Sequence, residues 1–225
     1  MVKIAVSGSK GKMGSRTIDL AKSDPEFQCT GEFDVDGNAA DAIKSCDCLI
    51  EFTSPDATME HLAMCEKEKK GIVIGTTGLS EEQRNKIKEA SANIPVVISP
   101  NMSVGVNLLF NLVGTASKVL GSEYEISILE AHHAEKKDAP SGTAKELEKI
   151  VKGIKGEETD VVISSVREGE IVGEHTITFE SDVDLIEITH SAKTRDIFVK
   201  GALQAAKFIA GKKNGLFTMK DVLAL

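Results

Sequence analysis

The stretch VKIAVSGSKGKMGS, residues 2–15, places three glycines directly after a short apolar run. We expect a buried strand over Val2–Val6 and a helix over Lys12–Ala21. A tight turn between them needs glycine, which allows positive φ and a close approach of the backbone to a ligand. The helix N-terminus would offer free amides and a positive dipole end to a pyrophosphate group. The glycines, Gly8, Gly11 and Gly14, have the spacing G-x-x-G-x-x-G, so a plain glycine-rich turn is the alternative.

Up to about residue 100, apolar runs alternate with helical patterns. Such alternation implies a parallel sheet covered by helices on both faces. We therefore predict an α/β fold that begins with a Rossmann-type parallel-sheet nucleotide domain. Further strands are expected at Phe27–Phe33, Cys48–Phe52, Ile72–Ile74 and Val96–Ile98, and helices at Thr58–Lys69 and Ser80–Ala90.

A second pattern begins near residue 104, where strand-like runs follow one another with few helices between them. It predicts a second α+β domain with an open mixed sheet. We expect residues 1–103 and 195–225 to form a dinucleotide-binding domain, and residues 104–194 to form a substrate-binding and oligomerisation domain. Exposed edges and faces of such sheets are often buried by oligomerisation. The expected helices are Asn107–Leu120, Thr143–Val151 and Ile197–Ala210, and the expected strands are Tyr124–Ile128, Val161–Arg167, His175–Glu180 and Leu185–His190.

The composition limits the partners and the location of this protein. The formal net charge is −8 and the pI is about 5.2, which argues against nucleic acid or an anionic membrane as a partner. No apolar run reaches the roughly 18 residues that span a bilayer, and we find no signal-peptide pattern. We expect a cytoplasmic protein. The four cysteines form no C-x-x-C pair and have no histidine at a metal-ligand spacing, so we expect buried thiols and no metal site.

Polar side chains follow the other expected strands, at the edge where a parallel sheet binds ligands. Asp34 ends the second strand, at the distance from the glycines where a ribose-binding carboxylate is expected. Its alternative role is that of a turn residue in the run DVDG. Loops at Glu51–Pro55, Gly75–Gly78 and Ser99–Met102 fit the same crevice, although Gly, Thr and Asn are also common in ordinary turns.

The run EAHHAEKKDAPSGTA, residues 130–144, holds two of the five histidines and two lysines within a few positions. These side chains supply positive charge and transferable protons, which suits a small dianion. At the helix mouth that follows, free amides and the Thr143 hydroxyl would suit a carboxylate. Thr143 and Glu146 also have capping-box spacing, so the alternative is a solvated loop ahead of a well-capped helix. The other histidines, His61, His175 and His190, are expected at ordinary surface or strand positions.

The run at residues 130–144 closely resembles the signature of dihydrodipicolinate reductases, also called 4-hydroxy-tetrahydrodipicolinate reductases. The match is specific because many unlike residues agree together. Other segments follow in family order over nearly the whole chain, including GSKGKMG, EFTSPDAT, GTTG, SPNMSVGVN, REGEIVGEH and GALQAAKF. The resemblance implies reduction of a small cyclic dicarboxylate by NADH or NADPH, with protonation and loss of water, on the route to diaminopimelate and lysine. It also implies a homotetramer whose C-terminal tail returns to the first domain.

The same resemblance implies roles for individual residues. His132 would be the acid/base histidine, Lys136 the proton donor and Asp34 the ligand of the adenosine ribose. The substrate would be bound by His133, Ser141, Gly142 and Thr143. The other cofactor-binding residues would be Gly8, Ser9, Lys10, Gly11, Lys12 and Met13 at the pyrophosphate, and Gly75, Thr76, Thr77, Ser99, Pro100, Asn101 and Met102 on the nicotinamide side.

The chain departs from the family pattern where the cofactor phosphate is selected. It is also short for the family. Lys12 replaces a common arginine, and Val35 follows Asp34 where NADPH-preferring members often carry arginine. A carboxylate at Asp34 would accept hydrogen bonds from ribose hydroxyls and repel a 2′-phosphate, whereas Lys12 and Arg16 on one helix face could partly compensate. We therefore expect use of both cofactors, with NADH used at least as well as NADPH.

Two other functions would share part of this sequence pattern. A dehydrogenase of an amino-acid semialdehyde would share the glycine turn, but it has no need for the run H-H-x-x-K-x-D-A-P-S-G-T. A dinucleotide-sensing module without catalytic activity should lack the proton donors. The presence of those donors favours the reductase.

Overall fold

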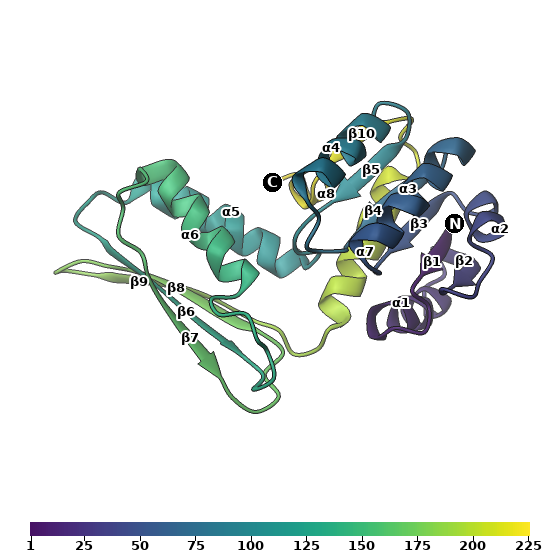
Figure 1. Ribbon diagram of the computed structural model, residues 1–225. Coiled ribbons are helices and arrows are strands. Elements are labelled where there is room, and N and C mark those ends of the chain that lie inside the picture. Colours follow the sequence, from purple (N-terminus) through teal and green to yellow (C-terminus); the bar gives the residue numbers. More distant parts are fainter. The chain divides into compact units, whose positions relative to one another are not determined.

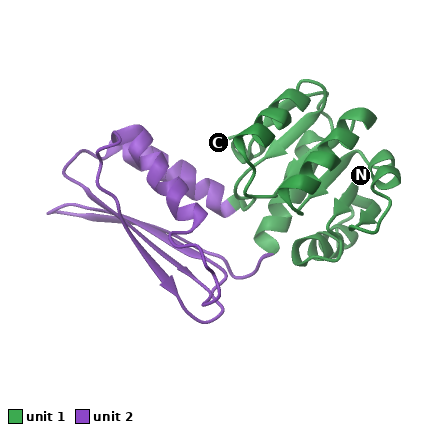
Figure 2. Ribbon diagram, viewed as in Figure 1, with its two compact units in different colours: residues 1–104, 196–225 green, residues 105–195 purple.

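The computed structural model describes every residue from Met1 to Leu225. The chain forms two compact units (Figure 2). The first unit combines residues 1–104 with residues 196–225, and the second comprises residues 105–195. None of the helices is both long and apolar enough to cross a membrane.

The first unit is built on a six-stranded sheet in which every strand pairing is parallel (Figure 1). Its strands are β1 (Val2–Ser7), β2 (Phe27–Phe33), β3 (Cys48–Glu51), β4 (Gly71–Ile74), β5 (Pro95–Ile98) and β10 (Gly215–Phe217). The strand order is β10-β5-β4-β3-β1-β2, so the order reverses between β1 and β3. Ligands of doubly wound sheets bind beyond the carboxyl ends of the strands at such a reversal. The predicted Rossmann-type sheet is confirmed.

Helices cover both faces of this sheet. They are α1 (Lys12–Ser23), α2 (Ala39–Ser45), α3 (Pro55–Glu68), α4 (Glu81–Ala90), α7 (Asp196–Ile209) and α8 (Met219–Leu223). Successive residues of β1 point to opposite faces. Ile4 and Val6 pack with residues of α1 and α7, whereas Ala5 packs with residues of α2, α3 and α4. The tail therefore belongs to this unit, as the sequence predicted, since α7 covers the sheet and β10 pairs with β5.

The second unit has a four-stranded mixed sheet with its helices on one face (Figure 1). Its elements are α5 (Val104–Val119), β6 (Glu125–His132), α6 (Gly142–Lys155), β7 (Val162–Arg167), β8 (Glu174–Glu180) and β9 (Leu185–Ser191). The strand order is β7-β6-β8-β9, and only β6 and β7 pair in parallel. Ile128 and Ile177 form a core with α5 and α6, while Leu129 and Val162 are about half exposed on the opposite face, at 50% and 57%. The predicted open mixed sheet is confirmed.

Four local features differ from the expectation. Helices α2 and α8 and strand β10 were not predicted, because seven, five and three residues are too few to show a clear periodicity. The predicted capping box of Thr143 and Glu146 is wrong. Helix α6 starts at Gly142, and its N-cap is Ser141, whose Oγ accepts a hydrogen bond from the Ala144 amide at 3.3 Å. Thr143 already lies inside the first turn, so its hydroxyl cannot occupy the N-cap position.

Candidate active site

The glycine turn between β1 and α1 forms a backbone cradle at the carboxyl end of the sheet. Gly8 has a φ of 66°, in the left-handed region. A Cβ at Gly14 would lie 2.0 Å from the carbonyl oxygen of Gly8, so only glycine fits there. The N-cap residue Gly11 provides no side-chain cap, and the first turn of α1 holds no acidic residue. Free amides and the helix dipole at this point fit a pyrophosphate. The same turn and the start of α1 hold Ser9, Lys10, Lys12 and Met13.

Asp34 follows β2 and bonds back to the glycine turn. Its Oδ2 accepts a hydrogen bond from the Lys10 amide at 3.0 Å, and its Oδ1 accepts one from the Val35 amide at 2.9 Å. Both bonds lower the pKa of Asp34, and the bond from the Lys10 amide has the larger effect. The side chain is therefore a carboxylate at neutral pH. Its remaining lone pairs can accept hydrogen bonds from ribose hydroxyls.

Arg16 on α1 is engaged within the first unit. Its Nε and Nη2 atoms each donate to a carboxylate oxygen of Asp196, the first residue of α7, at 2.7 Å. A second carboxylate, that of Asp19, lies 3.9 Å from its Nη1. The guanidinium is thus neutralised by a bidentate ion pair. Arg16 is therefore already bound, and of the two residues expected to bind a cofactor phosphate together only Lys12 is left.

A buried carboxylate, Glu51, joins the ends of β1 and β3. It is completely buried and accepts hydrogen bonds from Ser7 Oγ at 2.6 Å and from Thr53 Oγ1. Its Oε2 also lies 2.6 Å from Nδ1 of His61 on α3. The side chain of His61 is only 12% exposed, so the expected surface position is wrong. The Thr53 amide donates to Thr76 Oγ1 at 3.1 Å, so the network continues to the loop after β4.

The loop after β5 contributes less side-chain surface than the sequence predicted. Ser99 Oγ donates to the carbonyl of Asn101 at 2.8 Å, and Asn101 Oδ1 accepts from the Ser103 amide at 2.9 Å. Met102 is only 2% exposed and packs in the core with residues of α7. Its side chain therefore cannot line a cofactor site, and only its backbone could do so. Among the predicted cofactor residues of the loops after β4 and β5, the exposed or partly exposed positions are Gly75, Thr77, Pro100 and Asn101.

In the second unit, His132 ends β6 and is held by a carboxylate two residues earlier. Nδ1 of His132 lies 2.5 Å from Oε2 of Glu130. Arg167, which pairs with His132 across β6 and β7, donates to both oxygens of Glu130, at 2.7 and 3.0 Å. Glu130 is completely buried and His132 is 8% exposed. The sequence analysis assigned no role to Glu130 or Arg167, although residues two apart on a strand share a face.

Burial and hydrogen bonding set the charges of this cluster. Burial by itself would raise the pKa of Glu130, but hydrogen bonds from Arg167, Ser165 and His132 lower it to about 2. Burial lowers the pKa of His132, although the hydrogen bond with Glu130 opposes this effect. At neutral pH the cluster therefore contains an ionised Glu130 beside a largely neutral His132 ring.

His175 completes the cluster from β8. It pairs with Glu130 across the sheet, and its ring meets that of His132 edge to face, with centroids 5.1 Å apart. Its Nε2 lies 3.2 Å from Ser141 Oγ. Burial, and after it the nearby His132, lowers the pKa of His175 to about 4. His175 does lie on a strand, as expected, but it belongs to the candidate site. A histidine at an inward-facing strand position was the signal that could have indicated this.

The loop after β6 brings the predicted proton donor next to this cluster. Nζ of Lys136 lies 2.7 and 2.9 Å from the two carboxylate oxygens of Asp138, and this ion pair lowers the pKa of Asp138. His133 is partly buried at the start of the loop. Ser141 is 2% exposed and is hydrogen-bonded within the cluster, because its amide donates to Glu130 Oε1 at 3.2 Å. The residues of this helix start with exposed surface are therefore Gly142 and Thr143.

Glu130, His132 and His175 are also side chains of the kind that ligate metals, and one ligand atom of each lies within 4.8 Å of the others. A metal would have to compete for a carboxylate that already accepts hydrogen bonds from Arg167, His132 and the Ser141 amide. A guanidinium cation bound to both oxygens disfavours a second cation. We therefore interpret the three residues as a hydrogen-bonded network.

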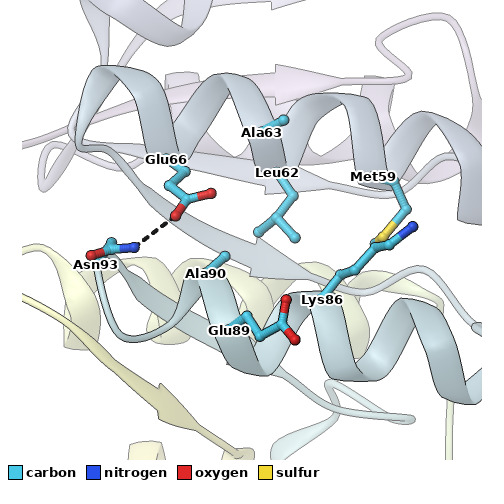
Figure 3. A pocket seen from close by; sticks show the side chains of 8 residues that line it. All are labelled: Met59, Leu62, Ala63, Glu66, Lys86, Glu89, Ala90 and Asn93. Atoms are coloured by element: carbon cyan, nitrogen blue, oxygen red, sulfur yellow. Dashed lines mark hydrogen bonds between the residues drawn. The ribbon is translucent and has the colours of Figure 1, made fainter.

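A separate groove of about 320 Å³ lies between α3 and α4 in the first unit (Figure 3). Leu62 and Ala90 form part of its apolar lining, and Glu66 at its rim accepts a hydrogen bond from Asn93 at 2.7 Å. None of the predicted cofactor or substrate residues lines it. It is distinct from the glycine turn and from the histidine cluster.

Two family models match the chain one after the other. The model described as dihydrodipicolinate reductase, N-terminus, matches residues 2–102, and the model described as dihydrodipicolinate reductase, C-terminus, matches residues 105–223. The chain belongs to the dihydrodipicolinate reductase family. Members of this family are pyridine-nucleotide-dependent reductases with a Rossmann fold, which identifies the chain as an oxidoreductase and supports NAD(P)H as its cofactor.

Relatives in the dihydrodipicolinate reductase family match over their full length. The 4-hydroxy-tetrahydrodipicolinate reductase of Syntrophotalea carbinolica is 38% identical over 266 positions, which cover 100% of both chains. That of Hahella chejuensis is 40% identical over 266 positions, again with 100% of both chains covered. Because the alignments are longer than the 225 residues of this chain, these relatives carry insertions that it lacks.

Solved structures share the fold. Dipicolinate-bound dihydrodipicolinate reductase from Paenisporosarcina sp. TG-14 has a TM-score of 0.84 at 20% identity and covers 97% of both chains. A probable dehydrogenase from Thermotoga maritima has a TM-score of 0.67 at 11% identity and covers 98% of this chain and 92% of its own. The fold alone does not distinguish dihydrodipicolinate reductases from other dehydrogenases, so the family assignment depends on the sequence matches.

Proposed function

We propose that this protein reduces 4-hydroxy-tetrahydrodipicolinate to tetrahydrodipicolinate with NADH or NADPH, in the synthesis of diaminopimelate and lysine. The observation that carries the proposal is the cluster at the end of β6, where the motif residues His132 and Lys136 adjoin the Glu130 network in a chain of this family. The test is a coupled assay in which the upstream synthase makes the substrate and nicotinamide absorbance is followed. Oxidation that requires both proteins supports the proposal, and absence of oxidation at micromolar enzyme contradicts it.

The cofactor-binding role belongs, in this proposal, to the first unit. The glycine turn from Gly8 to Met13 would bind the pyrophosphate, with the amides at the start of α1 as donors, because those of Ser9, Lys10 and Gly11 already donate within the chain. Asp34 would bind the adenosine ribose. Gly75–Thr77 and Ser99–Asn101 would line the nicotinamide side, together with the backbone of Met102. The bound nicotinamide supplies the hydride. The free amides at the start of α1 and the ionised Asp34 support this assignment.

The substrate-binding role belongs to the second unit. The substrate carries two carboxylates and must lose water and gain a hydride and a proton. His133 and Lys136 would provide positive charge, and Gly142 and Thr143 would bind one carboxylate at the N-terminus of α6. Lys136 would deliver the proton, with His132 as the acid/base residue. The neutral ring of His132 beside an ionised Glu130 supports its role, since such a ring can both accept and release a proton near neutral pH.

We further propose a homotetramer formed through the open face of the second sheet. Residues on this face include Leu129, Val162 and Val166, which are 50%, 57% and 37% exposed. Their side chains lie opposite the face that packs on α5 and α6. Leu129 pairs with Ser164 and Thr176, so the face combines these apolar side chains with small hydroxyl side chains that an interface can also bury. We place the enzyme in the cytoplasm, where its four free cysteines would stay reduced.

A further inference from the structure

Glu130 accepts more hydrogen bonds than any other side chain described in the candidate active site. Each of its oxygens accepts at least two hydrogen bonds: Oε1 from Arg167 Nη2 and the Ser141 amide, and Oε2 from Arg167 Nη1 and His132 Nδ1. The side chain of Ser165 also bonds to the carboxylate. The side chain has no contact with solvent. A buried charge with all of its acceptor sites filled is held in one position and one charge state.

This arrangement determines which nitrogen of His132 carries the proton when the ring is neutral. An ionised carboxylate can only accept a hydrogen bond, so Nδ1 of His132 must be the donor across the 2.5 Å contact. The neutral ring then has its lone pair on Nε2. Nε2 is also the side of the ring that lies next to Gly173, where a Cβ would stand only 3.1 Å away. A side chain at position 173 would therefore crowd Nε2, and glycine avoids this.

We propose that Glu130, held in place by Arg167, is a positioning residue for the reduction, which keeps Nδ1 of His132 protonated and leaves Nε2 to exchange a proton with the substrate. This inference rests on the proposed function of His132. Glu130 itself does not touch the reacting atoms. It acts by orienting the ring and by stabilising the imidazolium that forms whenever Nε2 takes up a proton.

Arg167 also holds the loop that carries Lys136 in place. While its two Nη atoms hold Glu130, Nη2 also donates to the carbonyl of Asp138 at 2.6 Å. Glu130 in turn accepts from the Ser141 amide. One buried ion pair therefore fixes the ring of His132 and two points of the following loop.

The charged and titratable groups around His132 come from several elements. Glu130 shares its strand, Arg167 faces it from β7, His175 from β8 and Lys136 from the following loop. His175 is uncharged at neutral pH, since burial lowers its pKa to about 4. Glu130 is therefore the only anion in direct contact with His132, because the other nearby carboxylate, Asp138, is paired with Lys136. Its removal should lower the pKa of His132.

The test compares Glu130→Gln with the wild type in kcat, KM, NADH affinity and the pH profile of kcat. Glutamine keeps the shape but not the charge, so we expect kcat to fall by roughly 100-fold or more, as for other acid–base residues. KM and the NADH Kd should change by less than about threefold. The limb of the profile that belongs to His132 should move to lower pH, whether His132 acts as acid or base, and Glu130→Asp should restore part of kcat. The matched control is Glu135→Gln, an exposed carboxylate in the same loop, which should behave as wild type.

A second measurement needs no folded variant of Glu130. With only five histidines, nitrogen-15 NMR of labelled wild-type protein can identify the tautomer of His132, using His132→Asn for assignment. We expect the tautomer protonated at Nδ1, and the Nε2–H tautomer would overturn the inference. So would wild-type kcat and an unmoved pH profile in Glu130→Gln while His132→Asn is inactive. If instead the wild type shows no reductase activity, the proposed function fails, and the NMR result still decides the ring geometry.

Discussion

The ammonium group of Lys136 is bound by both carboxylate oxygens of Asp138, its neighbour two residues along the loop. Without substrate, the proposed proton donor is therefore already paired with an anion. Asp138 is more exposed than Lys136, with 56% against 23% of the side chain accessible. A substrate carboxylate that reaches the loop can take the place of Asp138 at the ammonium group. Two predictions follow from this ion pair.

We expect Lys136→Ala to lose most of kcat, by roughly 10²–10⁴-fold, because general acid–base groups contribute about that much. The NADH Kd should stay unchanged, since Lys136 lies in the second unit and the glycine turn in the first. Steady-state kinetics and a fluorescence titration with NADH measure the two effects. Lys137→Ala removes an exposed lysine from the next position and serves as the control. Near-normal turnover of Lys136→Ala would exclude the role of proton donor.

We expect Asp138→Asn to lower KM for the substrate. The wild-type substrate must displace a carboxylate from Lys136, and the amide competes less well for a cation. The improvement should be at most about fivefold, since partly exposed ion pairs contribute only about 0.2–1 kcal/mol. KM measured at low and at high salt gives a further check, because salt weakens the same ion pair in the wild type. A KM that rises in Asp138→Asn would show that Asp138 helps to bind the substrate.

The buried His175 should make the second unit sensitive to acid. Its pKa is about 4 in the folded protein, against about 6.5 when unfolded. The folded state therefore resists protonation, so the stabilisation is complete above about pH 6.5 and is lost as the pH falls toward 4. At pH 5 the free energy of unfolding has already fallen by about 2 kcal/mol from its value at high pH. Urea denaturation at pH 7 and pH 5 should show a smaller loss of the free energy of unfolding in His175→Gln than in the wild type. Equal losses would contradict the assignment.

The proposed tetramer can be tested on the open face of the second sheet. Leu129→Glu places a charge at the middle of that face, and burying it would be costly, so we expect dissociation in light scattering at micromolar concentration. Val183→Glu is the matched control, because Val183 is 91% exposed between β8 and β9 and lies outside the strands. Its tetramer should remain intact. A monomeric wild type would refute the proposal directly.

Five of the six strands of the first unit could be predicted from the sequence, because a parallel sheet covered on both faces gives apolar runs such as β3 and β4, which are buried at every residue. The bounds expected for Phe27–Phe33 agree with β2. The burial of the Met102 side chain could not be predicted, for the opposite reason. The run SPNM has the residues of a ligand-binding loop, and the contact that buries Met102 comes from α7, a hundred residues later. The residues next to Met102 in the sequence give no sign of this contact with α7.

In the candidate site, too, residues of one local motif could be predicted, whereas contacts between distant segments could not. His132 and Lys136 could be predicted because one continuous motif contains both. Arg167 and His175 belong to a separate segment, REGEIVGEH, and their contact with Glu130 could not be predicted, since it depends on the pairing of β6 with β7 and with β8. Strand order and register are needed to see that these residues share the inward face of one sheet.

The expected cofactor preference is based on the surroundings of Asp34. Its carboxylate is ionised and bonded to the amides of Lys10 and Val35 at the glycine turn. A 2′-phosphate placed there would meet a like charge, whereas ribose hydroxyls can donate to it. Recognition of the phosphate normally uses a guanidinium, which binds it in a bidentate manner. Val35 offers none, and the guanidinium of Arg16 is bound by Asp196.

We therefore expect both cofactors to be used, with kcat/KM for NADH at least equal to that for NADPH. The two values should be measured at one salt concentration, because salt screens the charge of the phosphate. Val35→Arg is the informative variant, since Val35 is 96% exposed beside Asp34 and an arginine there could reach the phosphate without disturbing the core. It should raise the NADPH to NADH ratio of kcat/KM by about tenfold or more, while Val183→Arg, an equally exposed valine in the other unit, should leave the ratio unchanged. A wild-type preference for NADPH above about tenfold, or about 1.4 kcal/mol, would mean that Lys12 outweighs the repulsion by Asp34.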